Sequence, residues 1–517
     1  MSSKLKNIAV VSLSTVGSRL LGLLRDVLIF AALGASLWNS AFILAFTLPN
    51  LFRRLLGEGA LTSAMVPVFS DILEREGREG AFDFLNQVLV RLLLILVAMV
   101  SLGMCALGFI AQSGLLSERW ALGAELAVVL LPYMLFICLA ALISAGLNLV
   151  GRFAVAASTP ILLNLAMIGA LAAAMWLDSE AAKLVYWLCG GVMLGGLLQL
   201  AAPAYDLIRQ GWRPQFKMKQ TAALSELWSL FLPGLMGAAI LQINILVSRL
   251  LAYTLDDSAV SVLYLASRLM ELPLGIFTVA VATVFFPMLA KARSAGDAPG
   301  FSRAFIQGTR LVIGISVPAG VGLCVLGQPI LELLFQWGAF DRADVLATLP
   351  LIAIYGIGLP FYSAATFATR GLHASKDMKS PVRIAGLCLI INALASVLLM
   401  QFWGANGLAT ANVLAALVQA VLLWSALAKK HTDIAFRYMR SALSKILVAG
   451  CLMGLACFLG LQVIESFELI EKLHALVAVG MLVPIGAAVY FCLLFVFKFE
   501  EFDKLTGLIR RILGKAK

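Results

Sequence analysis

The amino-acid sequence predicts an all-α polytopic membrane protein with about fourteen transmembrane helices. Hydrophobic residues make up 62% of the 517 residues and charged residues only 13%, whereas soluble domains carry about 25% charged residues. The apolar residues also occur in runs of roughly 20, the length that crosses about 30 Å of hydrocarbon as a helix. Composition and run length therefore both indicate a bilayer as the solvent of most side chains.

The predicted spans follow one another with short polar connections. The first is expected to be an uncleaved span, because its apolar stretch contains Arg19 and Arg25 and continues beyond the length of a signal peptide. The spans are 7–33, 38–72, 83–112, 122–150, 156–177, 183–206, 224–252, 258–290, 304–328, 345–370, 382–403, 406–428, 442–464 and 473–497.

Lysine and arginine residues gather in every second loop, which predicts the orientation because cytoplasmic loops are the basic ones. Both termini are then cytoplasmic, and the opposite loops hold only Arg119, Lys183, Arg342 and Lys472. The net charge of +11 is thus a signal of topology, and no nucleic-acid partner is expected.

Proline patterns in the second and eighth spans indicate an internal repeat. Leu48-Pro49 and Val66-Pro67 in one correspond to Leu272-Pro273 and Phe286-Pro287 in the other. Two six-helix lobes repeated in parallel are a known transporter plan. The predicted organisation is an N-terminal lobe at 1–215, a C-terminal lobe at 220–430, two further helices at 440–497 and an amphipathic cytoplasmic tail at 498–517.

Several arginines lie within the predicted spans. A charge at the bilayer centre costs roughly 2.5–3.5 kcal/mol on insertion scales, so it usually faces a polar cavity or a partner. We expect Arg19 and Arg268 to face a cavity, because they lie too deep to reach the interface, with a buried ion pair as the alternative. Arg25 and Arg53 are further candidates, and Arg54 could serve the cavity or reach the interface.

Few acids accompany these arginines, and an excess of guanidinium groups favours an anionic ligand. Asp26, Glu58 and Glu271 are supporting candidates that would orient the arginines. The planar fork of arginine matches phosphate oxygens in bidentate contact. The remaining arginines of the spans are expected to extend to the interface. They are Arg91, Arg249, Arg310 and Arg370.

No motif of a catalytic or metal site is present in the sequence. The three histidines, His373, His431 and His474, lie in loops or at span ends, and the eight cysteines lie in apolar segments without metal-ligand spacing. We therefore expect no catalytic residue, no metal and no cofactor. A membrane-embedded transferase is the alternative in the class of enzymes.

Four segments and one loop together resemble the lipid II flippases of the MurJ/MviN type, in the multidrug/oligosaccharidyl-lipid/polysaccharide exporter superfamily. The resemblance runs over nearly the whole chain. The segments are Ser18-Arg19-Leu20-Leu21-Gly22 with Arg25-Asp26, Leu48-Pro49-Asn50-Leu51-Phe52-Arg53-Arg54 with Glu58-Gly59-Ala60, Ser267-Arg268-Leu269-Met270-Glu271-Leu272-Pro273 and Phe335-Gln336-Trp337-Gly338-Ala339-Phe340, and the loop is Lys376-Asp377-Met378-Lys379-Ser380-Pro381-Val382.

This resemblance implies a cargo, a site and a location. The cargo is undecaprenyl-diphosphate carrying the disaccharide-pentapeptide of peptidoglycan (lipid II), moved to the outer leaflet of the bacterial cytoplasmic (inner) membrane by alternating access. The implied partners are membrane lipids and cell-wall synthesis proteins, and spans thirteen and fourteen are the implied groove for the lipid tail. The implied substrate-binding residues are Arg19, Arg25, Arg53 and Arg268.

Two positions depart from the family pattern. Ser40 and Ser267 stand where members often carry an acid, which puts any gating salt bridge or proton-linked step at those acids in doubt. The alternatives are a flippase for another polyprenyl-diphosphate-linked glycan and a cation-coupled multidrug exporter.

Overall fold

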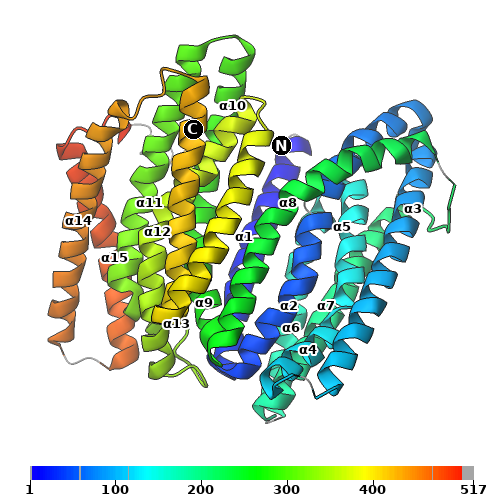
Figure 1. The fold of residues 1–517 in the computed structure, drawn as a ribbon, viewed down its shortest axis with the longest axis horizontal. Helices are drawn as coiled ribbons and strands as arrows, with labels where there is room; N and C mark the ends of the chain where they lie inside the picture. Colours follow the sequence, from blue (N-terminus) through cyan, green and yellow to red (C-terminus); the bar gives the residue numbers. More distant parts are fainter. Residues whose placement is uncertain are drawn as a thin grey trace. The chain divides into compact units, whose positions relative to one another are not determined.

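The computed structural model describes residues 3–57, 60–114, 116–177, 179–219, 221–467 and 470–502. Within those ranges the chain is helical, with turns between the helices and no β-strand (Figure 1). Glu58 and most of the predicted tail, residues 503–517, lie outside the described residues.

The described helices and two π-helical turns follow in chain order. They are α1 (Ser3–Leu33), α2 (Leu37–Phe52), η1 (Arg53–Gly57), α3 (Ala60–Gln112), α4 (Glu118–Leu130), α5 (Tyr133–Leu149), α6 (Ala154–Trp176), α7 (Ala181–Arg209), α8 (Ala222–Leu255), α9 (Ala259–Pro273), η2 (Leu274–Thr278), α10 (Val279–Ser294), α11 (Ala298–Leu334), α12 (Arg342–Ala374), α13 (Lys379–Lys430), α14 (Arg437–Glu465) and α15 (Glu471–Val496).

Among the described residues, ten helical stretches are long and apolar enough to cross a membrane, and the bent pair α4 and α5 makes an eleventh. Two of these stretches each contain a backbone break between predicted spans. The breaks are at Gly77 in α3, with φ of 73°, and at Gly404 in α13, with φ of 53°. Glycine adopts positive φ without steric cost. The all-helical fold predicted from the apolar runs is therefore confirmed.

The two π-helical turns follow prolines in the spans that showed the repeat. Pro49 precedes η1 and Pro273 precedes η2. Proline has no N–H to donate within a helix, and each π-helical turn begins within four residues after the proline. Such turns often occur at functional sites, and η1 begins with Arg53 and Arg54.

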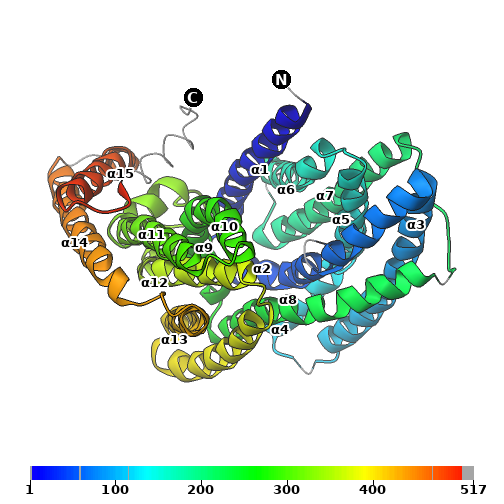
Figure 2. The same cartoon turned by 90° about the horizontal axis from the view of Figure 1, so that it is seen from above.

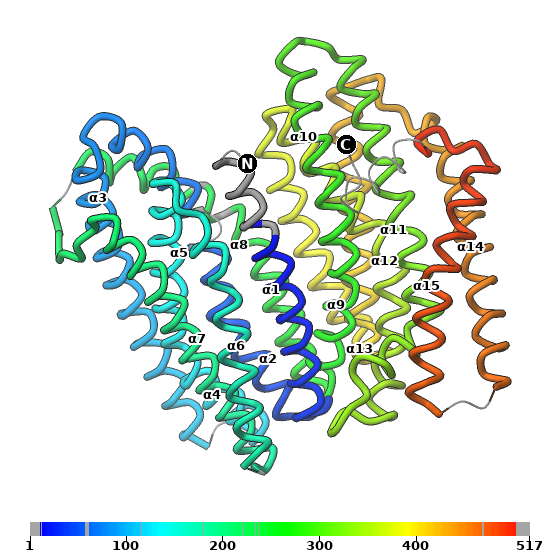
Figure 3. The backbone as a smooth tube through the Cα atoms, turned by 180° about the vertical axis from the view of Figure 1, so that it is seen from behind, coloured from blue at the N-terminus to red at the C-terminus, as the bar shows by residue number. Residues whose placement is uncertain are grey.

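The chain packs as two compact units. The first is Met1–Ser261 with Trp337–Phe340, and the second is Val262–Gln336 with Asp341–Lys517. In the first unit α6 lies beside α1 and α7 (Figure 2). In the second unit α14 and α15, the helices predicted at 440–497, pack against α11 (Figure 3).

The division by packing does not fall at the predicted lobe boundary of 215–220, because α8 packs in the first unit against α3 and α2. Polar contacts fix this position. The hydroxyl of Tyr253 donates to the carbonyl of Arg119 at 2.6 Å, and Arg249 donates to the hydroxyl of Thr47.

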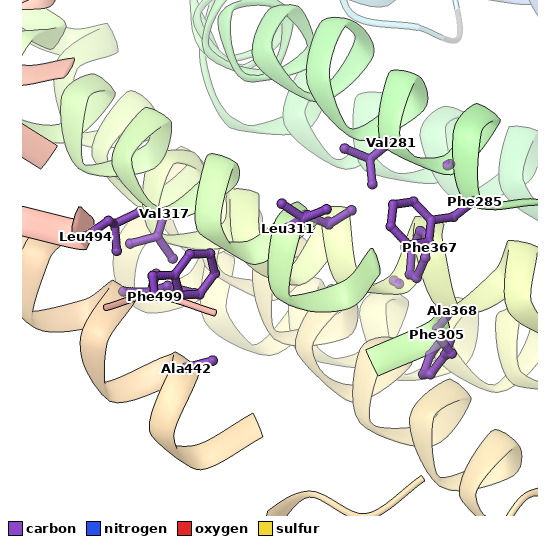
Figure 4. Packing of buried hydrophobic residues seen from close by; sticks show 14 of the residues in the cluster. Val281, Phe285, Phe305, Leu311, Val317, Phe367, Ala368, Ala442, Leu494 and Phe499 are labelled. Carbon is purple, nitrogen blue, oxygen red and sulfur yellow. The ribbon is translucent and has the colours of Figure 1, made fainter. Parts of the chain in front are cut away.

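The core of the second unit is built from aromatic side chains that glycines allow to approach. The rings of Phe305 and Phe367 stack with centroids 5.6 Å apart, and Phe285 meets Phe367 edge-on (Figure 4). A Cβ at Gly308 would clash with the ring of Phe367. These contacts join α10, α11 and α12 into one rigid group.

Candidate functional site: arginines within the spans

Arg25 joins α1 to α6 through a buried network. Its Nη2 lies 2.6 Å and its Nε 3.1 Å from Oδ1 of Asp26, while Nη1 donates to Oδ1 of Asn164 at 3.1 Å. The amide of Asn164 donates in turn to the carbonyl of Ser18 at 3.0 Å. Arg25 is 12% exposed and Asp26 1%. The guanidinium of Arg25 is thus already engaged by protein groups.

Arg19 lies on the same helix in a different setting. Its side chain is exposed, and no hydrogen bond or ion pair involves it in the part of the chain that the structure describes. Of the two arginines of α1, Arg19 is therefore the one whose donors are available to a ligand.

Arg53 and Arg54 open the π-helical turn η1. Arg53 is half-buried, and its Nε donates to Oδ1 of Asn50 at 3.3 Å. The amide of Asn50 donates to the carbonyl of Phe46 at 3.0 Å, which fixes the orientation of its oxygen. Arg54 is exposed. The predicted support from Glu58 lies outside the described residues.

Arg268 and Glu271 form an ion pair on one face of α9, with 3.5 Å between Nη1 and Oε2. The two side chains are 32% and 50% exposed. An exposed pair of this kind contributes only about 0–1 kcal/mol. Glu271 therefore orients Arg268 without holding it firmly.

Ser40 and Ser267, the serines at the two positions that depart from the family pattern, donate hydrogen bonds to backbone carbonyls. Ser40 is buried and donates to the carbonyl of Asp257 at 2.6 Å, which ties the start of α2 to the turn after α8. Ser267 donates to the carbonyl of Tyr264 at 2.9 Å within its own helix. Both hydroxyls are thus engaged with the backbone and bring no charge.

Three arginines that were expected to extend to the interface contact protein groups, and for Arg249 the contact lies within a predicted span, so the prediction is wrong there. Arg249 is half-buried and reaches Thr47, whose side chain is buried in α2. Arg91 donates to the carbonyls of Met218 and Lys219, at 3.0 Å each, and so fixes the segment before α8.

The third is Arg310, which is 10% exposed and forms ion pairs with Glu500 and, at 2.9 Å, with Glu501. The acids that follow the last span were the sequence signal for this contact. Arg249 had no such signal, because threonine is common on helix faces. Arg370, the fourth, is exposed near the end of α12.

The described arginines thus divide by what surrounds them. Arg25 is next to a buried carboxylate and Arg268 next to an exposed one, whereas the ion pairs found in the described ranges do not include Arg19 or Arg54. Guanidinium groups outside such ion pairs attract anions, and phosphate oxygens suit the planar geometry of a guanidinium. Among the described residues no group of three His, Cys, Asp or Glu could hold a metal ion.

Comparison with known proteins gives one consistent result. A family model described as the lipid II flippase MurJ matches residues 29–478. The chain is 34% identical over 432 residues to a probable lipid II flippase MurJ of Rhizobium meliloti (strain 1021), covering 82% of this chain and 81% of that protein. It is 31% identical to the lipid II flippase MurJ of Burkholderia cenocepacia over 426 residues, 80% of this chain and 82% of that one.

Solved structures agree. A lipid II flippase MurJ in an inward closed conformation superposes with a TM-score of 0.78 at 26% identity, covering 96% of this chain and 99% of the other. An inward-facing multidrug transporter of the MATE family has a TM-score of 0.66 at 15% identity, with 81% and 95% covered. The second likeness concerns the fold alone.

Proposed function

Because the chain belongs to the lipid II flippase MurJ family, we propose that it moves lipid II from the inner to the outer leaflet of the bacterial cytoplasmic membrane. The family match over residues 29–478 carries the proposal. Flipping is a transport step by alternating access, so it needs binding and release of the cargo and no covalent chemistry.

We further propose that Arg19, Arg53 and Arg54 bind the diphosphate of the cargo, and that Arg268 is a further cargo-binding residue. The support is the availability of Arg19 and Arg54 to a ligand and the π-helical turn that presents Arg53. A hydrogen bond to a charged group contributes about 1.5–3 kcal/mol. Loss of one guanidinium should therefore weaken binding about tenfold to a hundredfold.

Arg25 takes a different place in this proposal. Its bonds to Asp26 and Asn164 make it a positioning residue that fixes α1 against α6. Glu271 orients Arg268 in the same indirect way. The arginines matched to the family thus have two proposed roles. Some contact the cargo, and Arg25 positions the helices from which those contacts are made.

The topology belongs to the proposal as well. The charge of the loops supports cytoplasmic termini and an orientation that takes lipid II from the cytoplasmic side. The helices α14 and α15 are proposed to hold the polyprenyl tail, and the proposed partners are membrane lipids and the proteins that use lipid II in cell-wall synthesis. The membrane potential can drive release, since one charge moved through 100 mV gains about 2.3 kcal/mol.

Complementation of cells depleted of this protein tests the function. Lipid II should accumulate on depletion, and the wild-type chain should restore both growth and exposure of lipid II on the outer leaflet. Unchanged lipid II with accumulation of another polyprenyl-diphosphate glycan would refute the choice of cargo. Drug sensitivity with normal lipid II would indicate a multidrug exporter.

Variants of the arginines test the site separately from the function. We expect Arg19→Ala to abolish complementation and Arg19→Lys to restore part of it, because lysine keeps the charge and loses the fork. Arg370→Ala, at another exposed arginine of the described helices, is the matched control and should complement fully. Full activity of Arg19→Ala and Arg53→Ala at normal expression would refute the site.

A further inference from the structure

A groove of about 810 Å³ runs between α6 and α7 in the first unit, and no arginine lines it. One face of α6, from Leu165 to Ala173, forms one wall, and one face of α7, from Lys183 to Leu194, forms the other. Its size is in the range of roughly 300–1,000 Å³ that is usual for sites of small ligands. The lining is apolar except at the end near Lys183.

The groove has the depth of one leaflet. The stretch of α7 from Lys183 to Leu194 rises about 16 Å at roughly 1.5 Å per residue, about half of the 30 Å hydrocarbon thickness. It begins at the end of α7 next to the turn from α6. A lipid chain entering at that end would therefore stay within a single leaflet.

Glycines of this helix pair serve two different purposes. Gly191 and Gly195 allow close packing, because a Cβ there would lie 2.7 Å from Ala170 and 2.8 Å from Leu163. Gly169 and Gly190 have nothing within 4 Å of where a Cβ would lie, although both line the groove. A glycine within a helix costs about 1 kcal/mol relative to alanine, and packing between helices does not account for these two.

The end of the groove near the start of α7 has the side chains of a membrane interface. Tyr186 and Trp187 are each 43% exposed, and such aromatic residues are enriched at the level of lipid headgroups. Lys183 is exposed beside them, and it takes part in no ion pair within the described ranges. The hydroxyl of Tyr186 is 3.5 Å from the carboxylate of Glu125, so the aromatic side chain is oriented from α4.

We propose that this groove binds one glycerophospholipid of the surrounding bilayer, with an acyl chain against Gly169 and Gly190 and its phosphate beside Lys183. One lysine matches the single charge of a phosphodiester. The diphosphate of the cargo is a poorer fit, because the groove offers no guanidinium fork and the carboxylate of Glu125 lies at its mouth. The site is thus distinct from the proposed transport site and would couple the lipid environment to α6.

Native mass spectrometry of the full-length protein tests the proposal. The protein is released from detergent after incubation with phosphatidylglycerol and undecaprenyl phosphate together. We expect wild-type protein to keep one phospholipid that Gly190→Leu and Gly169→Leu lose, because the leucine side chain fills the groove. Lys183→Gln should keep it at least several times more weakly.

Gly480→Leu is the matched control, because Gly480 in α15 is an equally open helical glycine outside the groove. It should keep the phospholipid. Thermal unfolding checks the fold of each variant, and Lys183→Gln, at an exposed position, carries the test if either leucine variant unfolds. Equal phospholipid retention in wild type and Lys183→Gln, undecaprenyl phosphate in its place, or a protein dimer that Gly190→Leu abolishes would each overturn the proposal.

Discussion

Replacing Asp26 with alanine removes the carboxylate that neutralises Arg25 between α1 and α6. The pair is buried, with exposures of 1% for Asp26 and 12% for Arg25. Removing one partner of a buried pair costs about 3–5 kcal/mol, because the remaining charge is left without compensation. Arg25 keeps its bond to Asn164, so we expect the lower end, about 3 kcal/mol.

A loss of that size lowers the ratio of folded to unfolded protein about a hundredfold. Unfolding by denaturant in a fixed detergent, followed by tryptophan fluorescence, measures it. The matched control is Asp257→Ala, which removes the partner of Arg119 at 2.7 Å where the two side chains are 60% and 27% exposed. That exposed pair should contribute less than about 1 kcal/mol.

Two further variants separate support from cargo binding. Combining Asp26→Ala with Arg25→Met should recover much of the stability, since no unpaired charge remains. Arg25→Lys should lower stability while transport per folded molecule stays near the wild-type rate. Unchanged unfolding of Asp26→Ala would refute the buried pair, and a stable Arg25→Lys that cannot transport would assign Arg25 to the cargo.

Two predictions concern the turns outside the spans. Burial lowers the pKa of His431, helped by the charges of Arg293 and Lys430 and opposed by Asp433. The neutral ring therefore stabilises the fold at pH 7.5, and that contribution should be lost as the pH falls below about 6.5. Thermal unfolding at pH 7.5 and 5.5 measures this, and an equal loss of thermal stability at pH 5.5 in His431→Gln would contradict it. Arg152→Asp should lower thermal stability, because it breaks the 3.0 Å ion pair with Asp206. Adding Asp206→Arg should restore most of that stability. A double variant no more stable than the single variant would show that the pair does not act through its charges.

Hydrophobicity made the helices predictable, because each span must bury its own backbone hydrogen bonds in apolar surroundings. The breaks at Gly77 and Gly404 also fall where the sequence places short polar or glycine-containing connections. The π-helical turns could not be predicted. Proline at 49 or 273 removes a donor, but whether the chain kinks or widens depends on contacts with neighbouring helices.

The arginines show how far the depth of a residue within its predicted span can indicate the role of that residue. Depth marked Arg19 and Arg25 alike, whereas in the described part of the chain Arg25 takes part in an ion pair and Arg19 does not. The partner Asp26 is adjacent in the sequence, but the bond to Asn164 could not be predicted, because Asn164 lies far along the chain in α6. Arg249 was assigned to the interface for the same reason, because its contact Thr47 lies in α2 and leaves no trace near Arg249 in the sequence.

Two turns carry the strongest argument for the internal repeat, which stays a prediction. In the first unit the N–H of Arg152 donates to the carbonyl of Leu147 at 2.9 Å, after a residue with φ of 82°. In the second unit the N–H of Asp377 donates to Leu372 at 2.9 Å, after a residue with φ of 61°.

Each of these turns is then joined to a later helix by an ion pair, but the charges are exchanged. Arg152 pairs with Asp206 at the end of α7, whereas Asp377 pairs with Lys430 at the end of α13. Hydrogen bonds from Lys430 and Ser380 outweigh burial and hold the pKa of Asp377 well below its usual range. Identity between the halves is lost at these positions, although the backbone and the ion pair are the same. A repeat of this kind preserves the interaction and not the residues that form it, so a search for identical residues in the two halves would miss this ion pair.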